Sequence, residues 1–320
     1  MLKQVIKLTT QLLGLFFLCL ASYLVYREVH HIGWHEIYAQ ITRLPVSIFF
    51  TALFFVFLDY LALSMYDFLS LHYIGQKIQK WLVFKTAFIS FSITNTTGHS
   101  YIAGGSVRYL FYSKAGLTEF QILKIIAFES LTFLMGMGIV LDICLILSHF
   151  MHMSVMKNYQ HILDIGAVVI SMAFISYILF VVLKKRQFKW KNITIQSPDL
   201  SLTFKQMLVG AGDIFSASLV FYILFSSHFD VSYLHVAVIF LIAQLIGIST
   251  QVPGGLGVFE ASFLYLYPHT EAEKVPLLAT LISFRVLYYF LPFLISCFYL
   301  LITGVMHFIF SNNRHHSKNN

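Results

Sequence analysis

The chain has 320 residues, of which 58% are hydrophobic, 17% aromatic and only 11% charged. A soluble domain is about half apolar and roughly a quarter charged, so this composition excludes a chain that covers itself with polar surface in water. The apolar runs are long and continuous, and they lack the alternation over about ten residues that β-barrel strands show. We therefore expect an all-α polytopic membrane protein.

The positions of the basic residues explain the net charge of +7 without nucleic acid. These residues stand at the ends of apolar segments, as in the run 184–186, which is the distribution that the positive-inside rule describes. The three cysteines, Cys19, Cys144 and Cys297, fall inside apolar segments and show no metal-ligand spacing. We expect buried thiols, no metal and no cofactor.

A transmembrane helix needs about 20 mostly apolar residues. In chain order, the stretches that meet this requirement are 8–26, 46–70, 120–148, 163–183, 205–227 and 277–303. The first of them resembles a signal sequence in charge and apolarity, but the many spans behind it favour an uncleaved first span. Two further apolar regions, 83–112 and 235–268, are interrupted by glycines.

Lysines and arginines predict the orientation of these elements. They are frequent near both ends of the chain and in the stretch 184–191, so we expect cytoplasmic N- and C-termini. By the same rule, the segments that flank the first broken region lie inside, and those that flank the second lie outside. Each broken region then enters and leaves the membrane by one face, and the two regions do so from opposite faces.

The resulting order of elements predicts a single membrane domain over 1–306 with an internal repeat. Each repeat, about 8–148 and about 163–303, would hold three full transmembrane helices and one re-entrant helical hairpin, and the second would be inverted. Eight plain spans are the alternative. The polar segment 307–320 is expected to be a disordered tail.

The first glycine break contains Gly98, His99, Gly104 and Gly105, and Arg108 follows it. Backbone groups at a hairpin tip inside a membrane are tolerated only where protein or a water-filled cavity covers them. The other explanation of the glycine pair is close packing of helices, which small residues permit. His99 is a candidate proton carrier at the tip, and a structural histidine is the alternative.

The second glycine break is formed by Pro253, Gly254, Gly255 and Gly257, and Glu260 follows it. Proline is suited to the first turn of a helix. A helix that begins near Gly254 would direct its free N–H groups at an anion, and a phosphate is the natural ligand. Close helix packing is again the alternative.

Several ionisable residues fall deep inside the expected spans. Asp59, Glu129, Asp213 and Arg285 are all far from the nearest polar loop, and Asp142 is similar. Charges at this depth are costly and are functional candidates by default. The alternative is that they form structural ion pairs with one another. Arg108, Glu260 and Arg285 are the stronger candidates because they lie beside the expected hairpin tips.

The string Pro-Gly-Gly-Leu-Gly-Val-Phe-Glu at 253–260 resembles the hallmark of the lysylphosphatidylglycerol synthase transmembrane family. The stretch from Gly104 to Arg108 is similar to the family's first glycine-rich segment. Arg285 follows Glu260 at the distance of the family's last-span arginine, and Asp59 and Glu129 are compatible with acidic positions of the family. The resemblance covers about residues 8–306.

This resemblance implies a flippase-like membrane domain, as in the multiple peptide resistance factors, which moves an aminoacylated or other amphiphilic phospholipid between leaflets of the bacterial inner membrane. The expected lipid ligands are Arg108, Arg285, Glu260, Asp59 and Glu129, together with the backbone at Gly254, Gly255 and Gly257. Lysyl-phosphatidylglycerol is one candidate lipid, and a separate synthase is a candidate partner. The chain ends soon after its last span, so no soluble lysyltransferase domain is expected. A membrane-embedded lipid-modifying enzyme and a non-transporting lipid-binding scaffold are the alternatives.

Overall fold

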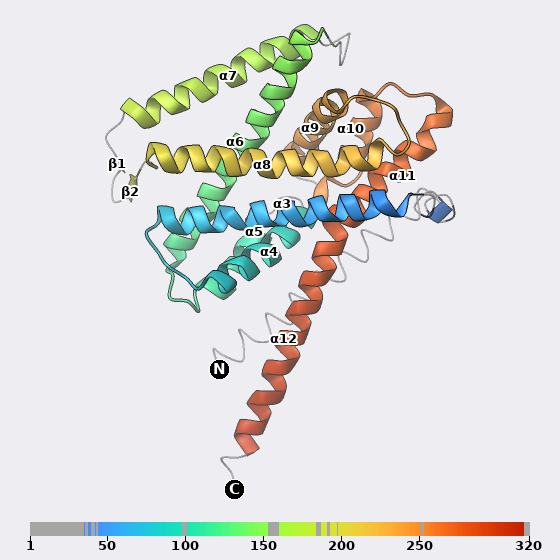
Figure 1. Cartoon of the computed structure of the whole chain (residues 1–320). Coiled ribbons are helices and arrows are strands. Elements are labelled where there is room, and N and C mark those ends of the chain that lie inside the picture. Colours follow the sequence, from blue (N-terminus) through green and yellow to red (C-terminus); the bar gives the residue numbers. More distant parts are fainter. Residues whose placement is uncertain are drawn as a thin grey trace.

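The structure is a computed structural model, and Figure 1 shows it as a long helical assembly. It describes residues 35, 38–39, 42, 44–97, 101–152, 160–183, 187–190, 193–196, 198–250 and 253–316. The predicted first span, 8–26, and the predicted tip residues Gly98 and His99 lie outside these ranges.

The first half of the described chain consists of a long helix, two short helices and a second long helix. Their bounds are α3 (Val46–Tyr73), α4 (Lys80–Thr96), α5 (Tyr101–Tyr112) and α6 (Glu119–Phe150). The α6 helix begins at a capping box, in which the Thr118 side chain accepts from the Gln121 backbone and the Gln121 side chain accepts from the Thr118 backbone. A glycine with positive φ, Gly116, precedes that cap and turns the chain out of α5.

The second half repeats this order after an additional helix and a short hairpin of strands. The additional elements are α7 (Gln160–Leu183), β1 (Gln187–Trp190) and β2 (Ile193–Gln196), and the strands are antiparallel. Then follow α8 (Leu200–Phe225), α9 (Tyr233–Ser249), the 3₁₀ turn η2 (Pro253–Gly255) and α10 (Val258–Leu266). A final long helix is assembled from η3 (Glu271–Glu273), α11 (Lys274–Phe284), the π-helical segment η4 (Arg285–Phe290) and α12 (Leu291–His316).

Five helical stretches are long and apolar enough to cross a membrane among the residues that the structure describes. They coincide with the predicted spans 46–70, 120–148, 163–183, 205–227 and 277–303, so a helical membrane protein is confirmed. The all-α class is confirmed, and the expected basic loop adds one short hairpin in which β1 pairs with β2. The α12 helix extends to His316, into the segment 307–320 for which the sequence predicts a disordered tail, and that disorder stays a prediction.

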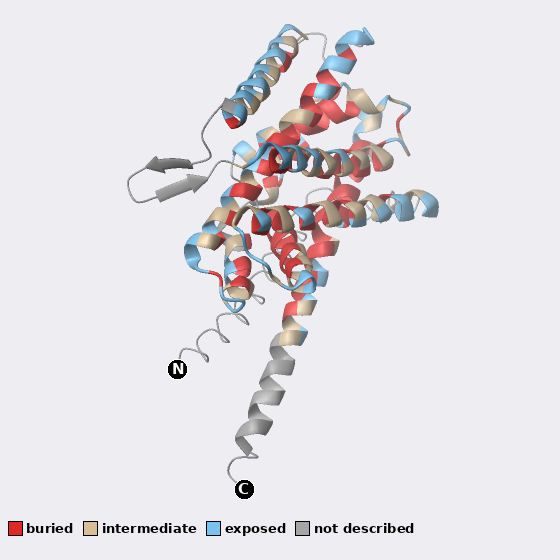
Figure 2. Ribbon diagram, turned by 60° about the vertical axis from the view of Figure 1, so that its left-hand side comes forward, coloured by how far each residue is buried: buried red, intermediate tan, exposed pale blue. Residues whose placement is uncertain are grey.

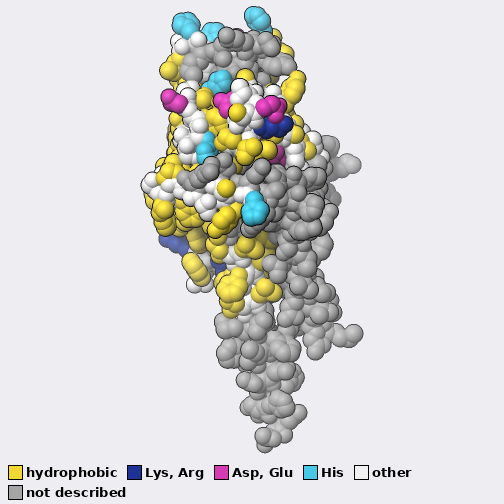
Figure 3. Space-filling view, turned by 90° about the vertical axis from the view of Figure 1, so that its right-hand side faces the viewer, with side chains coloured by type: hydrophobic (Ala, Val, Ile, Leu, Met, Phe, Trp, Pro, Cys, Tyr) yellow, Lys and Arg dark blue, Asp and Glu magenta, His cyan; other side chains and the backbone are white. Residues whose placement is uncertain are grey.

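The outside of the bundle is apolar, as a lipid-facing surface must be. On α7, Ile162, Ile165 and Met172 each expose more than 60% of their surface. Figure 2 shows this contrast, with exposed residues along α7 and buried residues gathered in the centre of the molecule. In Figure 3, hydrophobic side chains cover much of the described part of one face. No water-soluble protein leaves so much contiguous apolar area uncovered.

Two close helix contacts hold the long helices in place. The α6 and α8 helices cross at Gly136 and Gly210, where an added Cβ at either residue would overlap backbone atoms of the other helix. The α3 and α8 helices lie side by side along most of their length (Figure 1). Small residues at a crossing let backbones approach closely, which is the main source of packing energy between helices in lipid.

The second glycine break lies against the end of α4, the helix that precedes the first break. Gly254 has a φ of 63°, and a Cβ there would lie 2.9 Å from the carbonyl oxygen of Thr96, the last residue of α4. Each break joins two helices that pack together, α4 with α5 and α9 with α10. Gly104 packs directly on Thr94 and Ser90, and Gly247 faces Phe259 and Gly255. The structure therefore brings the end of α4, in the first half of the chain, into contact with the break between α9 and α10, in the second half.

Candidate functional site

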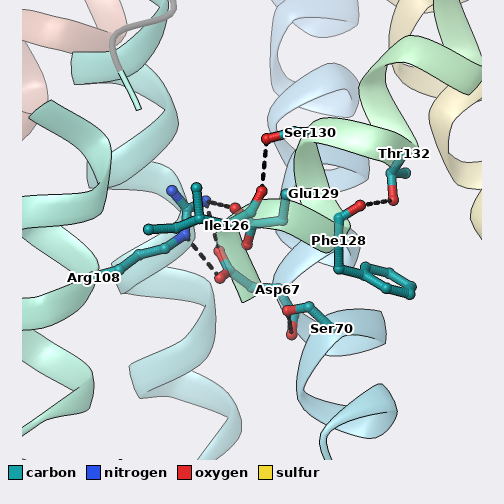
Figure 4. A network of polar contacts seen from close by, with 8 residues as sticks. All are labelled: Asp67, Ser70, Arg108, Ile126, Phe128, Glu129, Ser130 and Thr132. Atoms are coloured by element: carbon teal, nitrogen blue, oxygen red, sulfur yellow. Dashed lines mark hydrogen bonds and ion pairs between the residues drawn. The ribbon is translucent and has the colours of Figure 1, made fainter. Parts of the chain in front are cut away.

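Arg108 is buried among acidic residues in the first half of the chain (Figure 4). It projects from α5, and its Nε and Nη2 lie 3.1 and 3.2 Å from the two carboxylate oxygens of Asp67 on α3. The same Nη2 lies 2.9 Å from Oε2 of Glu129 on α6. The guanidinium also stacks over the Phe91 ring of α4, 4.6 Å from its centroid. One cation therefore ties four helices together.

This cluster, Asp67–Arg108–Glu129, carries more negative than positive charge. None of its members exposes more than 5% of its surface. Glu129 Oε1 has no hydrogen-bond partner among the described residues. A buried ion pair is favourable only when hydrogen bonds satisfy its remaining polar atoms, so a cluster with an excess carboxylate and an unpartnered oxygen is suited to receive a further donor.

Arg285 forms the corresponding cluster in the second half. It is the first residue of η4, and its Nε lies 2.6 Å from Oε1 of Glu260 on α10. Its other nitrogens donate to the carbonyl oxygens of Gly254 and Gly255. Glu260 in turn accepts from the backbone N–H of Gly257 at 2.8 Å, which places the carboxylate at the N-terminus of α10. Glu260 and Arg285 therefore bind the backbone of the second break and each other.

The two clusters are related by a reversal of sign. In the first half, the second short helix supplies the arginine and the following long helix supplies the glutamate, Arg108 and Glu129. In the second half, the second short helix supplies Glu260 and the following long helix supplies Arg285. Each half thus joins its short hairpin to its last long helix through a buried Arg–Glu pair.

A third polar group lies between the two clusters. Asp59 on α3 accepts a hydrogen bond of 2.7 Å from the Tyr288 hydroxyl of η4. Asp213 on α8 accepts one of 2.6 Å from Tyr66. The two carboxyls lie close enough to repel each other, since α3 and α8 pack side by side. Asp59 is 0% and Asp213 is 2% exposed.

A cavity at the centre of the bundle lies between the Arg108 cluster and the residues Asp213 and Tyr288 of the third group. The space inside it that water-sized molecules can occupy is about 50 Å³. Arg108 and Glu129 line it from the first half, and Asp213, Gln244 and Tyr288 line it from the second. Apolar side chains form most of the remaining wall, and Thr94, Asn95 and Ser130 add polar groups. A mainly apolar cavity with a few convergent polar groups is the usual form of a ligand site.

The sequence-predicted residues are distributed over these groups. Arg108 and Glu129 meet in one cluster, Glu260 and Arg285 meet in another with the Gly254 and Gly255 carbonyls, and Asp59 belongs to the third. Gly104 and Gly105 lie in α5, and Gly105 lines the cavity. Whether these residues bind a ligand stays a prediction. The free N–H groups expected at the second break include that of Gly257, which is used by Glu260.

Sequence analysis missed Asp67, which accepts two hydrogen bonds from Arg108. Its position gave a clue, since it is a second acid two turns after Asp59 on a long apolar helix. Tyr66, Tyr288 and Gln244 were also missed, because tyrosine and glutamine are common in spans and nothing local marks these three. No group of three or more metal-ligating side chains occurs among the described residues.

Several apolar helices of membrane-spanning length around a buried, charged cavity define a polytopic helical membrane protein. The chain matches the family model described as the lysylphosphatidylglycerol synthase TM region over residues 11–296. The chain therefore belongs to this family, as its glycine motifs predicted.

Individual relatives have similar length or are much longer. The chain is 28% identical to slr0712 of Synechocystis over 83% of this chain and 82% of that protein. It is 27% identical to the inner membrane protein YbhN of Escherichia coli, over 84% and 85% of the two chains. It is also 25% identical to the phosphatidylglycerol lysyltransferase of Bacillus subtilis over 74% of this chain, but over only 28% of that enzyme.

Proposed function

We propose that the protein is a flippase-type transporter that moves an amphiphilic phospholipid between the leaflets of the bacterial inner membrane. The observation that carries this proposal is the central cavity, which brings Arg108 and Glu129 of one half together with Asp213 and Tyr288 of the other. A lipid head group is polar and must cross a hydrocarbon core, so its carrier needs buried polar groups of this kind.

The lengths of the short helices support two re-entrant hairpins. At 1.5 Å per residue, α5 is about 18 Å long and α10 about 14 Å, whereas the hydrocarbon core is about 30 Å thick. Each pair of short helices would enter and leave by one face, and the contact between Gly254 and Thr96 would lie at depth in the bilayer. Transporters with inverted repeats place their sites at such broken helices. The basic segments then put both termini in the cytoplasm.

The charges favour a lipid whose head group carries an ammonium beside its phosphate. Arg108 would bind the phosphate. Asp67 and Glu129 would give up part of their contact with Arg108 and bind the ammonium instead. The excess of acid over base in this cluster favours a cationic lipid over an anionic one. An aminoacylated phosphatidylglycerol has this chemistry, and its acyl chains would stay in the bilayer.

The names of some relatives suggest how such a lipid is supplied. The Bacillus protein is named a phosphatidylglycerol lysyltransferase, and this chain matches about a quarter of its length. We therefore do not assign the transferase activity to the matched region. A separate synthase would make the lipid that this domain moves.

Leaflet exchange of lipid in reconstituted vesicles tests the proposal. Fluorescent lysyl-phosphatidylglycerol and phosphatidylglycerol are placed in both leaflets, and an impermeant reductant reports how fast inner-leaflet lipid becomes accessible. Wild-type protein should accelerate exchange of the aminoacyl lipid over protein-free vesicles, and Arg108→Gln should abolish the acceleration. Asp142→Asn is the matched control, because Asp142 is buried on α6 but is hydrogen-bonded by Ser171 and is absent from the cavity wall.

Two results would contradict the proposal. One is wild-type protein that leaves the exchange of every tested phospholipid at the protein-free rate. The other is an Arg108→Gln protein that is folded and monodisperse in detergent and exchanges lipid at the wild-type rate. Chemical modification of the added lipid during the assay would instead favour a membrane-embedded enzyme.

A further inference from the structure

The pair Asp59–Asp213 has no role in holding a phosphate, and its chemistry differs from that of the two arginine clusters. Tyr288 donates to one carboxyl and Tyr66 to the other, at 2.7 and 2.6 Å. Among the described residues, no lysine, arginine or histidine forms an ion pair with either aspartate. The remaining oxygen of Asp59, Oδ1, is buried and has no hydrogen-bond donor.

Every charged or titratable group that faces this pair is either neutral or already engaged. Tyr60 and Tyr66 face it from α3, and Tyr288 and Tyr289 face it from η4. The nearest cations on neighbouring helices, Arg108 and Arg285, are bound to other carboxylates. On α6, Glu129 belongs to the Arg108 cluster, and Asp142 faces Ser171 of α7.

Two adjacent carboxylates without a cation cannot both be ionised in a buried site. The repulsion between them and the cost of burying two charges are relieved when one carboxyl holds a proton. The protonated carboxyl can then donate to the other, which also gives the unpartnered Asp59 oxygen a hydrogen-bond role. The pair therefore calls for a very small ligand that supplies one positive charge and one hydrogen-bond donor.

The pair also lies where a proton could affect the whole bundle. Asp59 and Asp213 are each the fourteenth residue of their helices, α3 and α8, which pack side by side and belong to opposite halves of the chain. Asp213 and Tyr288 line the central cavity, so water in the cavity can reach the pair. A proton shared by the pair would bridge two helices that would have to separate if one half moved against the other.

We propose that Asp59 and Asp213 form a proton-binding site in which the two carboxyls share one proton, and that uptake and release of this proton drive the movement of lipid. A hydronium ion in the cavity gives its proton to a carboxylate oxygen and leaves as water. Release is the reverse step. The doubly ionised pair repels itself and weakens the contact between α3 and α8. The coupling of the proton to lipid movement rests on the proposed transport function, but the proton site itself does not.

Infrared spectroscopy of the purified protein tests the site without any transport. A titration in detergent or lipid should show the carbonyl band of a protonated carboxylic acid that disappears as the pH is raised. The double variant Asp59→Asn/Asp213→Asn should lose this band, because the amides keep the shape and the tyrosine hydrogen bonds but bind no proton. Asp142→Asn should retain it. A double variant that keeps the full wild-type band would overturn the proposal.

Vesicles with a pH gradient test the coupling. Lipid exchange by the wild-type protein should depend on the direction of the gradient, and exchange by the folded double variant should not respond to it. Wild-type exchange that is indifferent to the gradient would overturn the coupling. If the band is present but no lipid moves under any condition, the proton site stands and the proposed transport function fails.

Discussion

The guanidinium of Arg285 lies 2.6 Å from the Glu260 carboxylate and also binds the carbonyl oxygens of the two glycines that precede α10. The glutamate in turn caps α10 through the Gly257 N–H. Arg285 therefore satisfies backbone groups that the helix break leaves without partners, which water would satisfy in a soluble protein. One side chain converts an interrupted helix into a stable element inside an apolar bundle.

Loss of Arg285 should destabilise the protein more than loss of an ordinary surface charge. Arg285→Gln leaves Glu260 buried without its cation and the glycine carbonyls without their donor, and breaking a buried ion pair costs about 3–5 kcal/mol. The melting temperature in detergent should fall by several degrees or more. The control is Lys274→Gln, because Lys274 pairs with Glu271 at 3.6 Å on the surface. Equal melting temperatures for the two variants would contradict this role.

Gly254 should be more sensitive to substitution than another glycine with nearly the same backbone conformation. Gly254 and Gly75 have φ of 63° and 70°, so alanine is strained at both by about 1–2 kcal/mol. A Cβ at Gly75 meets nothing within 4 Å, whereas at Gly254 it meets the Thr96 carbonyl oxygen. Gly254→Ala should therefore destabilise the protein clearly more than Gly75→Ala in thermal unfolding. Equal losses of stability in the two variants would show that the contact between Gly254 and Thr96 contributes nothing to stability.

The contact between Gly254 and Thr96 shows which part of the fold the sequence predicts and which part it does not. Apolar length alone located the long helices, because a 20-residue apolar run has few other stable forms in lipid. The second glycine break was also visible, since Gly254, Gly255 and Gly257 have positive φ, which few other residues adopt. Apolar length and glycine positions do not say which helix ends meet, and the structure places Gly254 against Thr96 at the end of α4.

The charge pairing was less predictable than the helices. Glu260 and Arg285 were recognised as candidates beside one break, and they do meet. The sequence predicts that Glu260, with Asp59 or Glu129, holds a cationic head group, and this stays a prediction. In the structure Glu129 belongs to the Arg108 cluster and Asp59 accepts from Tyr288. Partner choice depends on helix rotation and crossing, which composition does not encode. The π-helical segment at 285–290 also has no mark in its sequence, although two of its side chains, Tyr288 and Tyr289, line the cavity.

The crossing of α6 and α8 supplies a second matched pair of glycines. A Cβ at Gly136 would overlap the backbone of Gly210, whereas a Cβ at Gly212 meets nothing within 4 Å. Gly136→Ala should push the two helices apart and lower the melting temperature. Gly212→Ala removes a flexible residue from a helix interior and should be neutral or stabilising by up to about 1 kcal/mol. A Gly136→Ala protein as stable as wild type would show that the helices are not in close contact.

Replacement of Glu129 should change which lipid the cavity prefers rather than whether the protein folds. In Glu129→Gln, Arg108 keeps its two bonds to Asp67, so the remaining pair is neutral and satisfied. The lost carboxylate is the one with an unpartnered oxygen, which we assign to the ammonium of a cationic head group. The preference for lysyl-phosphatidylglycerol over phosphatidylglycerol in the vesicle assay should fall on the order of tenfold, since a buried charge contact sets specificity at this scale. Asp142→Asn removes a carboxylate from the same helix but outside the cavity, and it should leave the preference unchanged. If both variants lose selectivity equally, the preference reflects the overall charge of the bundle and not the Arg108 cluster.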